Sequence, residues 1–139
     1  MDKKRILTKI DELNVYLDEL DEIKIRDFDE YAKSKKDKRA CERLLQIAIE
    51  TVLDICNIIV SELKLGLPSD EDDLFKKLEN KKIITKKLSI ILKEMKGFRN
   101  ILVHRYGETD DEKVFEILSE KLEDFETFKE EILRFLKKN

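Results

Sequence analysis

The stretch from residue 97 to residue 107 holds the side chains that could do chemistry together. Its polar residues, separated by apolar ones, are Arg99, Asn100, His104, Arg105 and Tyr106, and His104 is the only histidine of the chain. An arginine guanidinium presents a fixed fork of donors that matches a phosphate group. A histidine transfers protons near neutral pH, and Tyr106 adds a phenolic hydroxyl. A lone histidine often only fills a core position, but beside Arg99 it marks this stretch as the candidate site.

Composition favours a single helical domain over residues 1–139. Charged residues make up 44% of the chain, and there are only 3 glycines and 1 proline, which favours long helices. The formal net charge is −3. No global positive field therefore attracts nucleic acid, and any RNA contact must use a local patch. We expect no DNA partner. We also expect no membrane association, because no segment shows the apolar length needed to span a bilayer.

The cysteines and the N-terminus indicate a cytoplasmic protein. Cys41 and Cys56 fall inside a predicted helix without metal-ligand spacing, so we expect buried free thiols in a reducing compartment. Residues 1–5 are mostly charged and do not begin the apolar run of a signal peptide. No cluster of histidine, cysteine or carboxylate suits a catalytic metal. We therefore expect no metal and no cofactor.

The elements that must position the candidate site are helices, because apolar residues recur at spacings of three and four. They are predicted at about 2–31 with a break near 26–27, at 37–65, from 69 to about 78, from 85 to about 107, and from 109 onward. The second is apolar over much of its circumference, which is typical of a central helix, and residues 66–68 (Gly-Leu-Pro) end it. The fold class is therefore all-α, an antiparallel bundle of four main helices plus one short helix.

Residues 99–106 resemble a known signature. They resemble the motif of HEPN-domain ribonucleases, in which an arginine, a polar residue after it, and a histidine occur in this order. Four residues between arginine and histidine, followed by any residue and a tyrosine, are similar to the HepT subfamily. Residues 41–50 and 54–57 also resemble its second helix, and residues 66–68 and 95–98 resemble its turn and the lead-in to the motif. The resemblance covers essentially the whole chain.

This resemblance implies a HEPN-like helical bundle that forms a homodimer. It implies a toxin of a toxin–antitoxin module, acting as a metal-independent endoribonuclease with tRNA as a candidate substrate. Arg99 and His104 would be the catalytic residues. The implied partner is a minimal nucleotidyltransferase antitoxin, which would silence the toxin by transferring AMP to Tyr106.

Helical geometry gives a separate reason to expect a homodimer. Each residue of a helix advances about 100°, so Arg99 and Tyr106 share a face while Arg99 and His104 diverge by about 140°. One protomer therefore does not aim both groups at one phosphate unless the helix loosens before His104. Two fourth helices packed together would let two Arg99 and two His104 line one cleft. Metal-free RNA cleavage also needs both a base and an acid, and a dimer holds two histidines.

Other polar residues could support this composite site. Asn100 could orient the histidine or bond a ribose or phosphate oxygen; alternatively it caps the helix end. Arg105 is either an RNA-backbone contact or a solvated charge. Glu50 and Asp54 lie one turn apart on the central helix and could orient the arginine by ion pairing, because carboxylates are costly to bury unpaired. Alternatively they face solvent.

Lysines flank the start of the fourth helix, at residues 81, 82, 86 and 87. They could follow a phosphate backbone, although such runs are more often solvated.

Two other function classes also fit the sequence. One is a catalytically inactive helical module that docks a nucleotidyltransferase partner or a nucleotide, and the other is a purely structural bundle.

Overall fold

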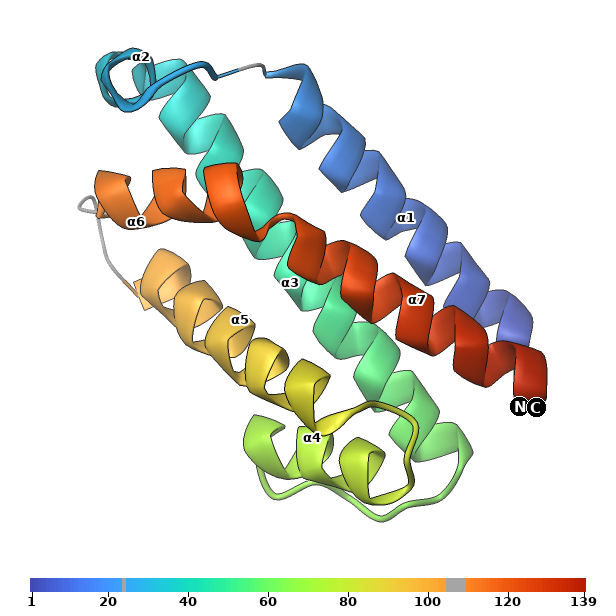
Figure 1. Cartoon of the computed structure of the whole chain (residues 1–139). Coiled ribbons are helices and arrows are strands. Elements are labelled where there is room, and N and C mark those ends of the chain that lie inside the picture. The colour runs from blue at the N-terminus through green and yellow to red at the C-terminus, as the bar shows by residue number, and fades with distance from the viewer. Residues whose placement is uncertain (24, 105–109) are drawn as a thin grey trace.

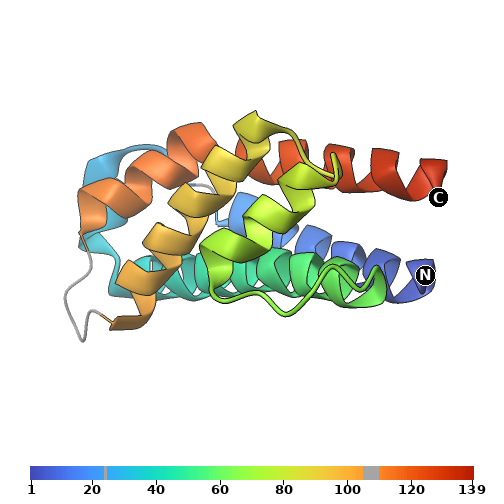
Figure 2. The same ribbon diagram turned by 90° about the horizontal axis from the view of Figure 1, so that it is seen from below.

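The chain folds into an up-and-down bundle of helices. The computed structural model describes residues 1–23, 25–104 and 110–139, with only the backbone of His104. Its elements are α1 (Lys3–Glu22), α2 (Phe28–Lys33), α3 (Lys35–Glu62), α4 (Glu71–Asn80), α5 (Lys86–His104), α6 (Asp111–Glu116), the π-helical turn η1 (Ile117–Lys121) and α7 (Glu123–Lys138). The long helices α1, α3, α5 and α7 run in alternating directions (Figure 1), and both termini lie at the same end of the bundle (Figure 2). The predicted all-α antiparallel bundle is confirmed, with three short helices rather than one.

Short polar side chains begin most of these helices. In each case a side-chain oxygen accepts the backbone N–H three residues later, and this satisfies a donor that the helix leaves open. These caps are Ser34 for α3, Asp70 for α4, Thr85 for α5 and Asp110 for α6. At the other end of α3, Gly66 has a φ of +100°, in the left-handed region that glycine adopts without a steric penalty. The chain therefore turns sharply into α4 at the predicted position.

Helix α3 is the centre of the bundle, as its wide apolar surface predicted. Its side chains from Cys41 to Val60 supply much of the buried core, and α1, α4 and α5 pack against it. By length and composition this helix could also cross a membrane, with a mean hydropathy of 1.7 over 18 residues. The expectation concerned an uninterrupted apolar run, and Glu50 and Asp54 interrupt the run in α3. Within the bundle 61% of that window is buried, so the apolar composition serves the core.

Two predicted helices are divided in the structure. The first segment splits into α1 and α2 because Asp27 caps a new helix through the N–H of Glu30, close to the break predicted near residues 26–27. The last segment was predicted as one helix but consists of α6, η1 and α7. No side chain of η1 is fully buried. Burial resumes in α7, where Phe125 and Phe128 lie in the core.

Both cysteines are free and buried, as predicted. Burial raises the pKa of the Cys41 thiol to about 11, and burial also raises the pKa of Cys56. Thiols react as thiolates, so neither group is activated as a nucleophile at neutral pH. Their role is to pack.

Candidate functional site

Helix α5 places Arg99 at the border between the core and the surface. Leu88, Leu92, Met95 and Phe98 recur at helical spacing and are buried. Arg99 follows Phe98, so it lies at the edge of this apolar face, where α5 packs against α4. Its side chain is 18% exposed. A charge this enclosed needs partners to offset its lost hydration.

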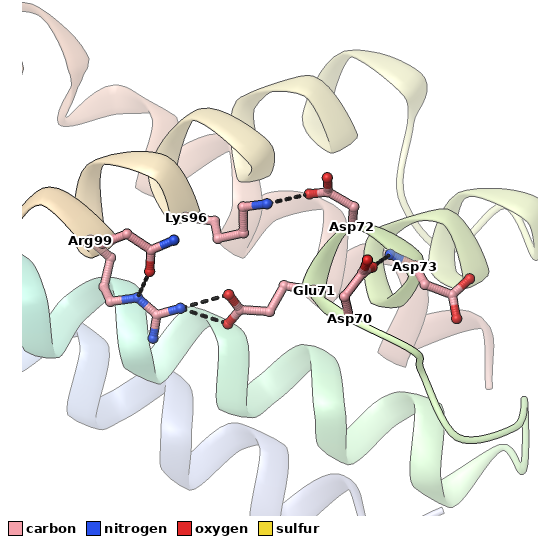
Figure 3. A network of polar contacts seen from close by, with 7 residues as sticks. Asp70, Glu71, Asp72, Asp73, Lys96 and Arg99 are labelled. Atoms are coloured by element: carbon pink, nitrogen blue, oxygen red, sulfur yellow. Dashed lines mark hydrogen bonds and ion pairs between the residues drawn. The ribbon is translucent and has the colours of Figure 1, made fainter. Parts of the chain in front are cut away.

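Two neighbours hold the Arg99 guanidinium in place. Its Nη2 donates to both carboxylate oxygens of Glu71, at 2.6 and 2.8 Å, and its Nε donates to Oδ1 of Asn100 at 3.0 Å (Figure 3). Charge-assisted hydrogen bonds of this length are stronger than neutral ones. Arginine carries five N–H donors, and no residue in the described part of the chain accepts from Nη1. The side chain is therefore held in one orientation by Glu71 and Asn100.

Glu71 comes from an acidic first turn of α4 in which each carboxylate has its own contact. Asp70 caps the helix, Asp72 bonds Lys96 of α5 at 2.7 Å, and Glu71 reaches Arg99 (Figure 3). Asp73 accepts the backbone N–H of Ser69, and this bond holds the pKa of the Asp73 carboxyl below its usual value. The sequence indicated these acids only as a helix start. Glu71 and Asp72 also fasten α4 to the helix that carries Arg99.

The structure changes the interpretation of three supporting residues. Asn100 was expected to orient His104 or contact RNA; its described bond is to Arg99. Asp54 could either pair with Arg99 or face solvent; it is 58% exposed and lies 3.8 Å from Lys9 of α1. Of the two alternatives, this position agrees with the solvent-facing one, on the side of α3 that borders α1. For Glu50, half-buried on α3, the described residues show no bond to Arg99.

Three predicted site residues lie wholly or partly outside the described residues. Arg105 and Tyr106 are not described, and His104 is described only as the last residue of α5. The α-helix continues to that residue, so it does not loosen between Arg99 and His104. On helical geometry the two positions then stay about 140° apart around the α5 axis. The sequence predicted that a helix that stays regular between these two residues needs a second copy of the chain to complete the site.

An open groove borders α5 on another face. It measures about 420 Å³ and is lined by apolar side chains, among them Ile91, Phe98, Ile117 and Phe125, with Glu94, Lys113, Lys121 and Asp124 beside them. Gly97 opens it further, because a Cβ built there meets nothing within 4 Å. The described residues contain no group of three or more His, Cys, Asp or Glu that could hold a metal ion.

The family described as ribonuclease HepT-like matches residues 13–132. The chain belongs to this family. A HepT-like relative named tRNA nuclease HepT, from Aphanizomenon flos-aquae, is 30% identical over 131 residues, which are 94% of this chain and 89% of that protein. An mRNA nuclease HepT from Shewanella oneidensis is 42% identical over 84 residues, or 60% of this chain and 63% of that one.

Solved structures of HepT-like toxins share the bundle. A toxin–antitoxin crystal structure with AMP-PNP matches with a TM-score of 0.83 and 29% identity, over 96% of this chain and 98% of that chain. A tri-AMPylated HEPN toxin of Shewanella oneidensis, in complex with its MNT antitoxin, matches with a TM-score of 0.82 and 30% identity, over 96% and 97% of the two chains. The predicted HEPN-like fold and HepT-like family are both confirmed.

The Glu71 contact is expected to contribute measurably to stability. Glu71→Ala removes a charge-assisted bond from a mostly buried arginine, so the free energy of unfolding should fall by about 1.5–3 kcal/mol. The matched control is Asp72→Ala, one residue along the same turn, whose partner Lys96 is more exposed. An exposed pair contributes about 0–1 kcal/mol. Equal losses in urea unfolding would show that Glu71 acts only as a helix-start acid.

Proposed function

We propose that this chain is the toxin of a toxin–antitoxin module and acts as a metal-independent endoribonuclease, with tRNA as the candidate substrate. The observation that carries this is Arg99, which Glu71 and Asn100 hold in a fixed orientation at the first position of the Arg–His–Tyr motif. The nuclease names of two relatives support the activity. The tRNA nuclease from Aphanizomenon flos-aquae supports the substrate class.

The proposed reaction uses the 2′-hydroxyl of the RNA as its nucleophile. One histidine takes the proton of that hydroxyl while the 2′-oxygen attacks the adjacent phosphorus. The bond from phosphorus to the 5′-oxygen breaks, and a second proton-transfer group protonates the leaving oxygen. The products are a 2′,3′-cyclic phosphate and a 5′-hydroxyl. Arg99 stabilises the negative charge that builds on the phosphate oxygens.

We place this site at the interface of a homodimer built across α5. His104 supplies one proton-transfer group per chain, and two chains supply the base and the acid. The α-helical backbone between Arg99 and His104 supports this assembly, because one chain keeps the two positions on different faces. The groove beside α5, with exposed Ile90 on the same helix, offers apolar surface to a second copy. The two buried free thiols support a cytoplasmic location.

The partner would be a minimal nucleotidyltransferase antitoxin that transfers AMP to Tyr106. Structures of related toxins with an antitoxin, one of them AMPylated, support this regulation. The sequence spacing of seven residues would put the tyrosine on the same helical face as Arg99. A tethered phosphate at that position would meet Arg99 and repel the RNA phosphate.

The proposal is tested by digesting RNA with the chain purified free of antitoxin. Cleavage should proceed in EDTA, by a species with the mass of two chains. Activity that EDTA abolishes and magnesium restores would contradict the metal-free mechanism, and full activity in a species with the mass of one chain would remove the composite site. A folded dimer that cleaves no RNA would instead favour the inactive binding module.

A further inference from the structure

A second cleft lies at the far end of α5 from the motif. It measures about 500 Å³ and lies between the turn after α4, the first residue of α5 and the last turns of α7. Figures 1 and 2 both show the C-terminal half of α7 beside this turn. Four cationic side chains line it: Lys82, Lys86, Arg134 and Lys138. They come from two stretches far apart in the sequence, residues 82–86 and residues 134–138, which the fold brings together.

The carboxylates of this cleft do not neutralise it. Glu131 uses both oxygens on Thr85, accepting its backbone N–H at 2.7 Å and its hydroxyl at 2.9 Å. Glu79 is the other acid of the lining. In the described part of the chain, none of the four cations is within salt-bridge distance of a carboxylate. Because four cations line the cleft against two carboxylates, it is a local positive patch on a chain whose net charge is −3.

Lys82 holds a backbone conformation that lysine rarely adopts. Its φ is +59°, in the left-handed region where asparagine and glycine are favoured. Its backbone N–H bonds the carbonyl of Glu79 and closes the end of α4, a function that asparagine would serve as well. The lysine side chain is thus not explained by the turn, whereas its position in a positive cleft explains it.

Basic residues of α5 connect this cleft with Arg99. From Lys86, the positions of Lys93, Lys96 and Arg99 are rotated by about 20°, 80° and 140° in one sense around the helix. Lys86 and Arg99 are about 20 Å apart along the axis, at 1.5 Å per residue. A polyanion that crosses α5 obliquely would meet the exposed Lys93 first, and it would compete with Asp72 for Lys96 and with Glu71 for Arg99.

We propose that this cleft binds the phosphodiester backbone of the RNA substrate at a distance from the scissile bond. The proposal rests on the function proposed above and extends it, because it explains how an acidic chain holds RNA. Single-stranded binding surfaces combine such a cationic path with strong salt dependence. The cleft contributes affinity along the backbone and no base recognition.

The test measures binding separately from cleavage. The probe is a fluorescein-labelled 2′-O-methyl oligoribonucleotide longer than the distance from the cleft to Arg99. Its blocked 2′-hydroxyl prevents the proposed reaction, so the result does not depend on whether the chain is a nuclease. Binding is followed by fluorescence anisotropy over a range of salt concentrations. The variant is Lys82→Asn with Arg134→Gln.

This variant should bind the oligonucleotide more weakly at low salt. Each lost phosphate contact makes the slope of log affinity against log salt shallower by about 0.7 for a single strand, so two lost contacts change it by about 1.4. The melting temperature should equal or exceed that of the wild type, because asparagine suits the left-handed position better than lysine. A purely structural role for Lys82 predicts an unchanged salt slope and a lower melting temperature.

A matched control removes the same charge elsewhere. Lys64 is the other described lysine with positive φ, at 55°, and it lines a different pocket. Lys137 lies on the last turns of α7 but does not line the cleft. The variant Lys64→Asn with Lys137→Gln should keep the wild-type slope, and equal slopes for both double variants would overturn the proposal. Displacement of the oligonucleotide by inorganic phosphate at constant ionic strength would also overturn it, by showing a small-anion site.

Discussion

Arg99→Ala is expected to lower the rate of RNA cleavage by about two orders of magnitude or more, the typical effect of removing a group that stabilises transition-state charge. His104→Ala should cause a loss of about 10²–10⁴-fold, because it removes a proton-transfer group. Both variants should keep the helical bundle. The Arg99 partner Glu71 is 34% exposed and can be hydrated when the arginine is removed.

Lys129→Ala is the control for Arg99→Ala. Lys129 is also enclosed, at 12% exposure, and bonds Glu126 and Asn14, but it lies on α7 away from the motif. This variant should cleave RNA at close to the wild-type rate. Circular dichroism checks the fold of all three proteins. A collapse of helix content in Arg99→Ala would support a structural role for the arginine, and wild-type rates in well-folded Arg99→Ala and His104→Ala would remove both residues from the site.

Tyr106→Phe is expected to abolish control by the antitoxin while leaving the nuclease intact. The substitution removes only the hydroxyl that would accept AMP. In the presence of the cognate transferase and ATP, the wild type should gain the mass of AMP and lose cleavage activity. The phenylalanine variant should keep its mass and its activity, because Arg99 and His104 are unchanged.

The control for this experiment is Tyr16→Phe. Tyr16 is a half-buried tyrosine of α1, and its substitution should leave both AMP addition and inhibition as in the wild type. Intact mass spectrometry reads the modification, and fragmentation assigns it to a residue. Absence of AMP on wild-type Tyr106, with a transferase shown to be active, would contradict this mechanism of regulation.

The fold was predictable from local signals. Apolar residues at helical spacing located the long helices, and Gly66 with Pro68 located the end of α3 because their backbone preferences are local. The division of the last segment into α6, η1 and α7 was not predictable in this way. Neither glycine nor proline marks η1, and the turn arises where no side chain is fully buried.

The candidate site was predictable in its motif but not in its support. The spacing of Arg99 and His104 is readable in the sequence, and so is the similarity to HepT-like proteins. The ion pair to Glu71 depends on how α4 packs against α5, and no local pattern distinguishes Glu71 from its acidic neighbours. Asp54 was a reasonable candidate by helix face alone. It lies beside α1, and its carboxylate contacts Lys9 instead of Arg99.

The central claim is that Arg99 and His104 cleave RNA through its own 2′-hydroxyl without a metal. The most direct measurement is mass spectrometry of the RNA ends after digestion in EDTA by the antitoxin-free chain. We predict fragments that end in a 2′,3′-cyclic phosphate and begin with a 5′-hydroxyl, and their absence with His104→Ala. Fragments with a 5′-phosphate and a 3′-hydroxyl, formed only when magnesium is added, would contradict the claim.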